Sequence, residues 1–219
     1  MIETDGRRLR GDASRRLVLD HAVDLASIEG LDGLSIGRLA DAAHVSKSGV
    51  ATLFGTKERL QLATVDAARQ RFVATVIEPA RLEPRGIRRI VALLDGWIAY
   101  SRDRTFTGGC FFAGATSEFD TKPGPVRDAL AAALAEWNGY VAVSFGYAVA
   151  QGELSGGDDP EQFAFEATAL LDAANNRSLL GGSNQPYAFA RRALVARLQA
   201  AGADAAVLAR LADVDDLAA

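Results

Sequence analysis

Apolar residues recur along most of the chain at intervals of three and four positions, the spacing that lines one face of an α-helix. No segment alternates apolar and polar residues over the length that a β-strand needs. The spacing predicts helices at about 13–29, 35–43, 46–53, 56–78, 84–102, 109–119, 125–152, 160–180, 186–200 and 204–211. We therefore expect an all-α protein.

Several helix boundaries carry residues with a specific conformational role. Gly30 follows the first helix, where glycine readily adopts the left-handed conformation common at helix ends. Thr56 can cap the helix that follows it. Because a proline disfavours helical geometry in the preceding residue, Pro79 is expected to end that helix near Glu78.

Two short helices separated by a tight turn at 35–53 predict a helix-turn-helix. Ala40 is the small residue required where such helices cross. His44 occupies the turn, and a histidine tolerates the left-handed backbone needed there at a cost of about 1 kcal/mol. The alternative is an ordinary helical hairpin within a bundle. The apolar positions that would fix the angle between the helices are Leu39, Ala43, Val45, Val50 and Leu53.

The segment 14–60 resembles the N-terminal domain of TetR-family transcriptional regulators. The matching residues are Val18, Leu19, Ala22, Gly30, Leu34, Ser35, Ile36, Leu39, Ala40, Ala43, Val45, Ser46, Lys47 and the run from Phe54 to Glu58. Beyond this segment only the helical layout agrees with the family. The resemblance implies a three-helix DNA-binding domain at 1–58, followed by a larger helical domain for effector binding and dimerisation at 59–219.

The second helix of such a motif enters the major groove of DNA with its N-terminal residues first. Lys47 is the residue expected to contact a guanine or a phosphate. The family commonly has a tyrosine at the position of Ala51, and histidine or tyrosine at that of Leu53, so the resemblance does not carry over the phosphate contact of that aromatic hydroxyl. Either Thr52 partly replaces it, or binding is weaker and depends more on the N-terminal arginines. The predicted DNA-binding residues are Ser35, Arg38, Ser46, Lys47, Ser48, Gly49, Val50, Thr52 and Lys57.

An arginine cluster near the N-terminus allows two interpretations. Arg7, Arg8, Arg10, Arg15 and Arg16 could form a basic arm that meets phosphate and replaces the missing contact. They could equally be a solvated N-terminal segment. Net charge does not decide between these, because residues 1–60 are neutral and the remainder carries the whole charge of −4.

Composition excludes several other classes of protein. One cysteine and no recognisable signal peptide favour the cytoplasm, and no apolar run approaches the length of a membrane span. Two histidines and one cysteine are too few for a typical zinc site. No phosphate-binding loop, dinucleotide fingerprint or nucleophile elbow is present, so we expect neither an enzyme nor a cofactor.

The family usually holds its effector within the helical body, and aromatic residues there could line such a pocket. A mostly apolar cavity with a few polar groups suits a small, mostly apolar effector. The alternative is that these residues are ordinary core. The predicted pocket residues are Trp97, Ser101, Cys110, Phe111, Phe112, Trp137, Tyr140, Val141, Thr168, Asp172 and Asn175.

The helix at 160–180 is apolar on two sides and that at 186–200 carries a narrow apolar stripe, with Arg191, Arg192 and Arg197 expected in solvent. This pattern favours a homodimer through these helices, with an intramolecular pair as the alternative. A twofold dimer spaces its recognition helices about 34–36 Å apart, matching a palindromic operator. We therefore predict a ligand-responsive repressor that its effector releases from double-stranded DNA. The alternative is a helical ligand-binding or protein-interaction module without specific DNA binding.

Overall fold

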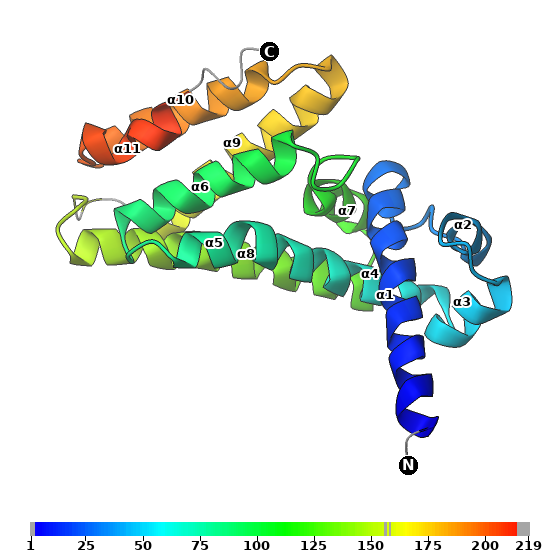
Figure 1. The fold of residues 1–219 in the computed structure, drawn as a ribbon. Helices are drawn as coiled ribbons and strands as arrows, with labels where there is room; N and C mark the ends of the chain where they lie inside the picture. Colours follow the sequence, from blue (N-terminus) through cyan, green and yellow to red (C-terminus); the bar gives the residue numbers. More distant parts are fainter. Residues whose placement is uncertain (1–2, 156, 158, 214–219) are drawn as a thin grey trace. The chain divides into compact units, whose positions relative to one another are not determined.

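In the computed structural model, the described residues are 3–155, 157 and 159–213, with side chains described from residue 11 onward. These residues form helices joined by turns, without a β-strand among them (Figure 1). The prediction of an all-α protein is therefore confirmed. The expected start of the first helix was wrong, because α1 runs over Glu3–Glu29 and begins ten residues before Ala13.

The chain divides into two compact units that are not consecutive in sequence. The first unit contains Met1–Gln70 and Phe106–Ala131, and the second contains Arg71–Thr105 and Ala132–Ala219. A functional boundary at residue 58 stays a prediction.

The first unit is built around the N-terminal helices. After α1 come α2 (Ile36–Ala42), α3 (Lys47–Phe54) and all but the last two residues of α4 (Lys57–Phe72). The returning segment adds α7 (Phe111–Phe119) and the start of α8 (Pro125–Ala150). The fully or almost fully buried apolar side chains that form its core include Val18, Ala22, Leu31, Leu39, Val50, Leu60, Phe106 and Phe111.

Polar contacts of long sequence separation hold the returning segment in this unit. Glu118 on α7 accepts hydrogen bonds from the backbone N–H groups of Leu31 at 2.7 Å and Asp32 at 2.9 Å. The N–H of Gly108 donates to the hydroxyl of Ser27 at 2.9 Å. A side chain at Gly108 would collide with the Ser27 carbonyl, so glycine is required for this approach.

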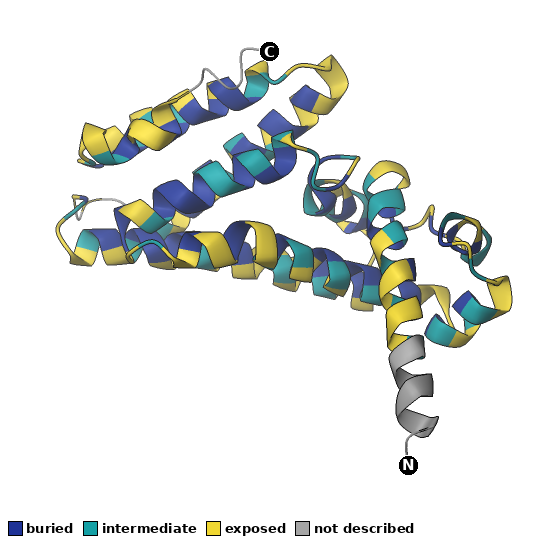
Figure 2. Cartoon of the chain, viewed as in Figure 1, coloured by how far each residue is buried: buried dark blue, intermediate teal, exposed yellow. Residues whose placement is uncertain are grey.

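The second unit contains a π-helical turn (Val73–Ile77), α5 (Glu78–Arg81), α6 (Ile87–Arg102), most of α8, α9 (Pro160–Gly181), α10 (Gln185–Ala200) and α11 (Ala205–Ala212). Buried positions follow α6 along its length, as Figure 2 shows. The core side chains include Ile90, Leu93, Leu94, Ile98, Phe145, Phe163, Leu171, Leu194 and Leu198.

The expectation that Pro79 ends a helix at Glu78 was wrong. The helical run continues to Arg81, because the wider π turn at 73–77 precedes the proline. In that turn the N–H of Glu78 reaches back five residues to the carbonyl of Val73. Pro79 then lies at the start of α5, where its missing N–H leaves no bond unmade.

Candidate nucleic-acid interface and ligand pockets

The turn between α2 and α3 has the geometry expected from the sequence. Ser46 caps α3 by accepting a hydrogen bond from the N–H of Gly49 at 3.0 Å. His44 has a φ of 53°, which confirms the predicted left-handed turn residue. The N–H of Val45 donates to the carbonyl of Ala40 at 3.0 Å and closes the turn. Ser35 likewise caps α2 through the N–H of Arg38 at 3.3 Å.

Buried apolar residues support this motif from beneath. Leu39 and Val50 are fully buried, and Ala40 is nearly so. The inclusion of Val50 among the DNA-binding side chains is therefore corrected, because its side chain belongs to the core that joins α2 to α3.

The opposite face of α3 presents polar side chains to solvent. Lys47, Ser48 and Thr52 are all exposed. The hydroxyl of Thr52 donates to the carbonyl of Ser48 at 2.8 Å, and its oxygen stays open to a donor. Lys47 makes no hydrogen bond or ion pair with the part of the chain that the structure describes, and its ammonium lies over Gly37 in the first turn of α2. This is the exposed cation nearest the start of the expected recognition helix.

Two other predicted contacts are engaged within the protein. Arg38 pairs with Glu29, and the ammonium of Lys57 donates to the carbonyl of Asp32 at 2.7 Å. A hydrogen bond from Lys122 is the main reason why the pKa of the Asp32 carboxyl lies below its ordinary value. These pairs are solvent-exposed, so each is worth only about 0–1 kcal/mol and a phosphate could displace it.

Near Ala51 and Leu53, where the sequence departs from the family pattern, Arg15 contacts the end of α3. Its guanidinium donates to the carbonyl of Leu53 at 3.1 Å and lies 4.7 Å from the centre of the Phe54 ring. Arg15 therefore holds α1 to the end of α3. Arg16 is exposed and donates to the carbonyl of Asp12. The side chains of Arg7, Arg8 and Arg10 lie outside the described residues.

The predicted pocket residues do not gather within one unit. Cys110, Phe111 and Phe112 belong to the first unit, where Phe111 packs against Phe106 with ring centres 5.9 Å apart. The other eight belong to the second unit.

Within the second unit, part of the predicted set belongs to a buried polar cluster. The hydroxyl of Ser101 donates to the amide oxygen of Asn175 at 2.9 Å and lies 2.8 Å from the hydroxyl of Tyr187. All three residues are buried. Thr168 donates separately to Asn138 at 2.7 Å. The Ser101 bonds join α6 to α9 and α10, and the guanidinium of Arg104 also donates to the Tyr187 hydroxyl at 3.4 Å.

A buried aromatic group in the second unit is another candidate for ligand binding. The Phe72 ring meets Tyr100 and Trp137 edge-on, with ring centres 5.3 Å apart in both pairs. Trp97 packs against Tyr100 at 6.3 Å. The indole N–H of Trp137 is buried without a hydrogen-bond partner among the described residues, which leaves a donor for an incoming acceptor.

Among the predicted pocket residues, Asp172 has a perturbed carboxyl group. Burial raises the pKa of Asp172 to about 6.

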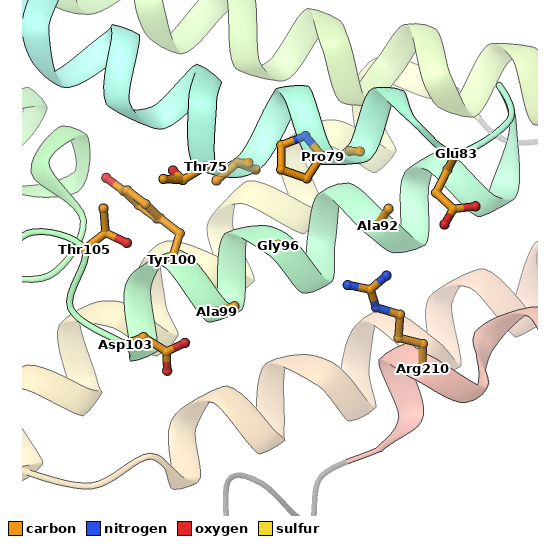
Figure 3. A pocket seen from close by; sticks show the side chains of 12 residues that line it. Thr75, Pro79, Glu83, Ala92, Gly96, Ala99, Tyr100, Asp103, Thr105 and Arg210 are labelled. Carbon is orange, nitrogen blue, oxygen red and sulfur yellow. The ribbon is translucent and has the colours of Figure 1, made fainter.

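A hollow of about 340 Å³ lies beside the π turn, and sequence reasoning missed it. Figure 3 shows Tyr100, Thr75 and Thr105 toward one end, with Glu83 and Arg210 toward the other. On α6 the hollow is lined by the small residues Ala92, Gly96 and Ala99, together with Tyr100. Small residues of this kind form no recognisable sequence motif. The residues lining the hollow are Thr75, Val76, Pro79, Ala80, Glu83, Ala92, Gly96, Ala99, Tyr100, Asp103, Thr105 and Arg210.

The dimer helices require two corrections. Arg197, expected in solvent, is partly buried and pairs with Glu166 at 2.7 Å. Arg191, expected in solvent, is buried and pairs with Asp95 at 2.7 Å. The stripe on α10 that contains Tyr187 and Leu194 is buried within its own unit. A different face stays exposed, and it carries Phe165 on α9 and Phe189 on α10.

These observations define a helix-turn-helix protein with a separate helical body. The family model described as the tetracyclin repressor-like C-terminal domain matches residues 86–194. No curated protein matches the chain. Within the described residues, no helix has both the length and the apolar character to cross a membrane.

Solved structures share the fold. A TetR transcriptional regulator from Chloroflexus aurantiacus J-10-FL has a TM-score of 0.79 at 23% identity, covering 84% of this chain and 93% of that chain. A TetR-family regulator from Cytophaga hutchinsonii has a TM-score of 0.74 at 17% identity, covering 84% and 92%. AibR, solved with isovaleryl coenzyme A and operator DNA, has a TM-score of 0.62 at 20% identity, covering 74% and 86%. The chain therefore has the fold of the TetR-family regulators, and its residues 86–194 match the model of the tetracyclin repressor-like C-terminal domain.

Proposed function

We propose that the protein is a homodimeric repressor that binds a palindromic operator and is released by a small, mostly apolar effector. The observation that carries the DNA-binding part is the exposed face of α3. Lys47, Ser48 and Thr52 are presented to solvent there by a helix whose other face is fixed by buried Val50. A helix-turn-helix meets base edges with this part of its second helix.

The charge distribution supports a phosphate-anchored interface around this helix. Lys47 lies over the first turn of α2, so its charge adds to the positive end of that helix dipole. Arg38 and Lys57 can exchange their exposed carboxylate and carbonyl partners for phosphate oxygens. Ser46 and Gly49 act mainly through the cap, which positions the backbone of the first turn. Affinity should then fall steeply with added salt.

The exposed apolar face of α9 and α10 supports dimerisation. Phe165 on α9 is 67% exposed and Phe189 on α10 is 50% exposed, and exposed apolar side chains of this size are typical of interaction surfaces. Ala169 and Ala193 line the groove between the two helices and allow close approach of another helix. A second copy of the same helix pair would cover this face in a four-helix arrangement.

The aromatic group and the adjoining hollow support an effector site in the second unit. Tyr100 belongs to both, and the unpartnered indole N–H of Trp137 favours a ligand with one acceptor group on an apolar body. The π turn at 73–77 lines the hollow and continues directly from α4. An effector that favours one arrangement of this turn would bias the start of α4 and thereby DNA binding.

Selection of binding sites from a random duplex library at two salt concentrations tests the proposal. We expect enrichment of an inverted repeat whose half-sites lie about one helical turn, or a multiple of it, apart. Weak, salt-sensitive binding without sequence enrichment would contradict the proposal and favour the alternative of a helical ligand-binding or protein-interaction module.

A further inference from the structure

A groove on the second unit gathers arginine and tyrosine side chains away from the hollow beside the π turn. It has a volume of about 450 Å³ and lies between α8 and the segment that joins α5 to α6. The residues that matter for its chemistry are Arg81, Arg85, Arg89, Tyr140, Val143 and Tyr147. No carboxylate is among its described lining residues.

Each tyrosine in this groove holds one arginine in place. The Nε of Arg81 donates to the hydroxyl of Tyr140 at 3.4 Å, and Nη1 of Arg85 donates to the hydroxyl of Tyr147 at 2.8 Å. The guanidinium of Arg85 also lies 4.9 Å from the centre of the Tyr147 ring. Since each hydroxyl accepts through its oxygen, it retains its own proton to donate to an anion.

The third arginine is fixed by neutral groups. Nε and Nη2 of Arg89 donate to the carbonyl of Glu83 at 3.2 Å and 2.7 Å, and Nη2 also donates to the carbonyl of Arg81. Backbone carbonyls orient the guanidinium without cancelling its charge. The exposed carboxylate of Glu78 pairs with Arg81 at 2.6 Å, so the groove keeps a clear positive excess.

The wall of the groove adds an apolar surface beside these cations. Val143 is 60% exposed and Tyr147 is 38% exposed, so both can contact a ligand. Arginine binds phosphate through two parallel N–H bonds, and the volume lies within the range of about 300–1,000 Å³ typical of small-molecule sites. A flat ring could rest against Val143 and Tyr147 while phosphates meet the arginines.

We propose that this groove binds a phosphorylated small molecule of nucleotide type, with its phosphates on Arg81, Arg85 and Arg89. The inference goes beyond the proposed function, because it assigns a second ligand site that neither DNA recognition nor the apolar effector requires. Binding of a phosphorylated metabolite would give the regulator a second input.

Calorimetric titration of the full chain with ADP, pyrophosphate and inorganic phosphate, without magnesium and at low ionic strength, tests this site. We expect ADP to bind most tightly and inorganic phosphate least tightly. The variant Arg81→Gln/Arg85→Gln should lose about tenfold or more in ADP affinity. The control Arg88→Gln/Arg192→Gln removes the same charge from exposed arginines outside the groove and should change the affinity less than about twofold.

A milder variant separates the groove from general charge effects. Tyr147→Phe keeps the ring and the net charge and should weaken ADP binding by a factor of about three, because one donor is lost. Equal losses in the groove and control variants would contradict the proposal, as would no detectable ADP binding. Loss of duplex DNA affinity in the groove variant with unchanged ADP affinity would identify a DNA contact instead and also overturn it.

Discussion

The two units use polar side chains in different ways. In the first unit, polar side chains satisfy backbone N–H groups at helix ends and turns, as Ser46 does for Gly49 and Glu118 does for Leu31. The second unit also has such caps, at Asp159 and Asp204, but in addition its buried polar side chains bind one another between helices, as Ser101 does with Asn175. The first arrangement sets the geometry of short exposed elements, whereas the second fixes how long helices pack.

This difference has a consequence for function. A recognition helix must be held firmly while its outer face stays free for DNA, and caps at its ends achieve that without using the exposed side chains. The body must instead keep helices in register while leaving room for a ligand. Buried polar pairs meet that need because they penalise alternative packings.

The largest effect is expected from the buried ion pair of the second unit. Arg191→Ala leaves Asp95 with only its more exposed partner Arg210, and should lower the free energy of unfolding by about 3 kcal/mol. Arg192→Ala, at the exposed neighbouring position, should cost less than about 1 kcal/mol. Urea denaturation measures both, and similar losses in the two variants would mean that the pair does not hold α10 to α6.

A pH-dependent effect follows from Asp172. Burial raises its pKa from 3.8 to about 6, so the folded chain keeps a proton that the unfolded chain loses. The free energy of unfolding should therefore fall as the pH rises from about 4 to about 6, by at most about 3 kcal/mol from this group. Urea denaturation across this range should show a smaller fall for Asp172→Asn than for the control Glu161→Gln. An identical pH profile in both variants would contradict the assignment.

The tie between α7 and the α1–α2 turn should contribute less. Glu118→Ala removes the acceptor for two backbone N–H groups and should cost about 2 kcal/mol, since both bonds are charge-assisted but partly exposed. Ser117→Ala is the matched control on the exposed side of α7. Thermal unfolding compares the two, and a loss no larger than that of the control would show that other contacts hold the segment.

Two left-handed residues give the smallest and sharpest test of the comparison. His44 and Arg104 have φ values of 53° and 54°. His44→Gly should stabilise the chain by about 1 kcal/mol, because it removes backbone strain alone. Arg104→Gly should destabilise it, because the Arg104 side chain also donates to Ser178 at 2.9 Å. Changes of the same sign in both variants would contradict the distinction between the units.

The elements of the first unit could largely be predicted from sequence because their signals are local. Glycine at position 30, the cap at Ser46 and the strained turn at His44 each act within a few residues. The contact from Glu118 to Leu31 spans 87 positions, and no local pattern marks it. The role of Arg15 could not be predicted either, because a helix arginine that packs against a neighbouring helix and one that is solvated look alike in sequence.

In the second unit the helices could be predicted from the sequence, but the partners of their polar side chains could not. Arg191 was expected in solvent because its partner Asp95 lies on another helix. Pro79 was expected to end a helix because the π turn that accommodates it has no recognisable local signature. Ser101 and Asn175, predicted as pocket residues, hydrogen-bond to each other and Ser101 also to Tyr187, and no local pattern marks these long-range pairs.

The central claim is tested most directly by comparing the parent chain with the variant Lys47→Ala/Thr52→Ala. Fluorescence anisotropy at fixed salt measures the affinity of each for the duplex recovered from the site selection. Both side chains lie on the exposed face of α3, so we predict a loss on the order of 10- to 100-fold and relaxed sequence preference. Arg88→Ala/Ser117→Ala removes one cation and one hydroxyl at exposed positions outside α3 and should bind as the parent does. Unchanged affinity and sequence preference in the α3 variant would contradict the account.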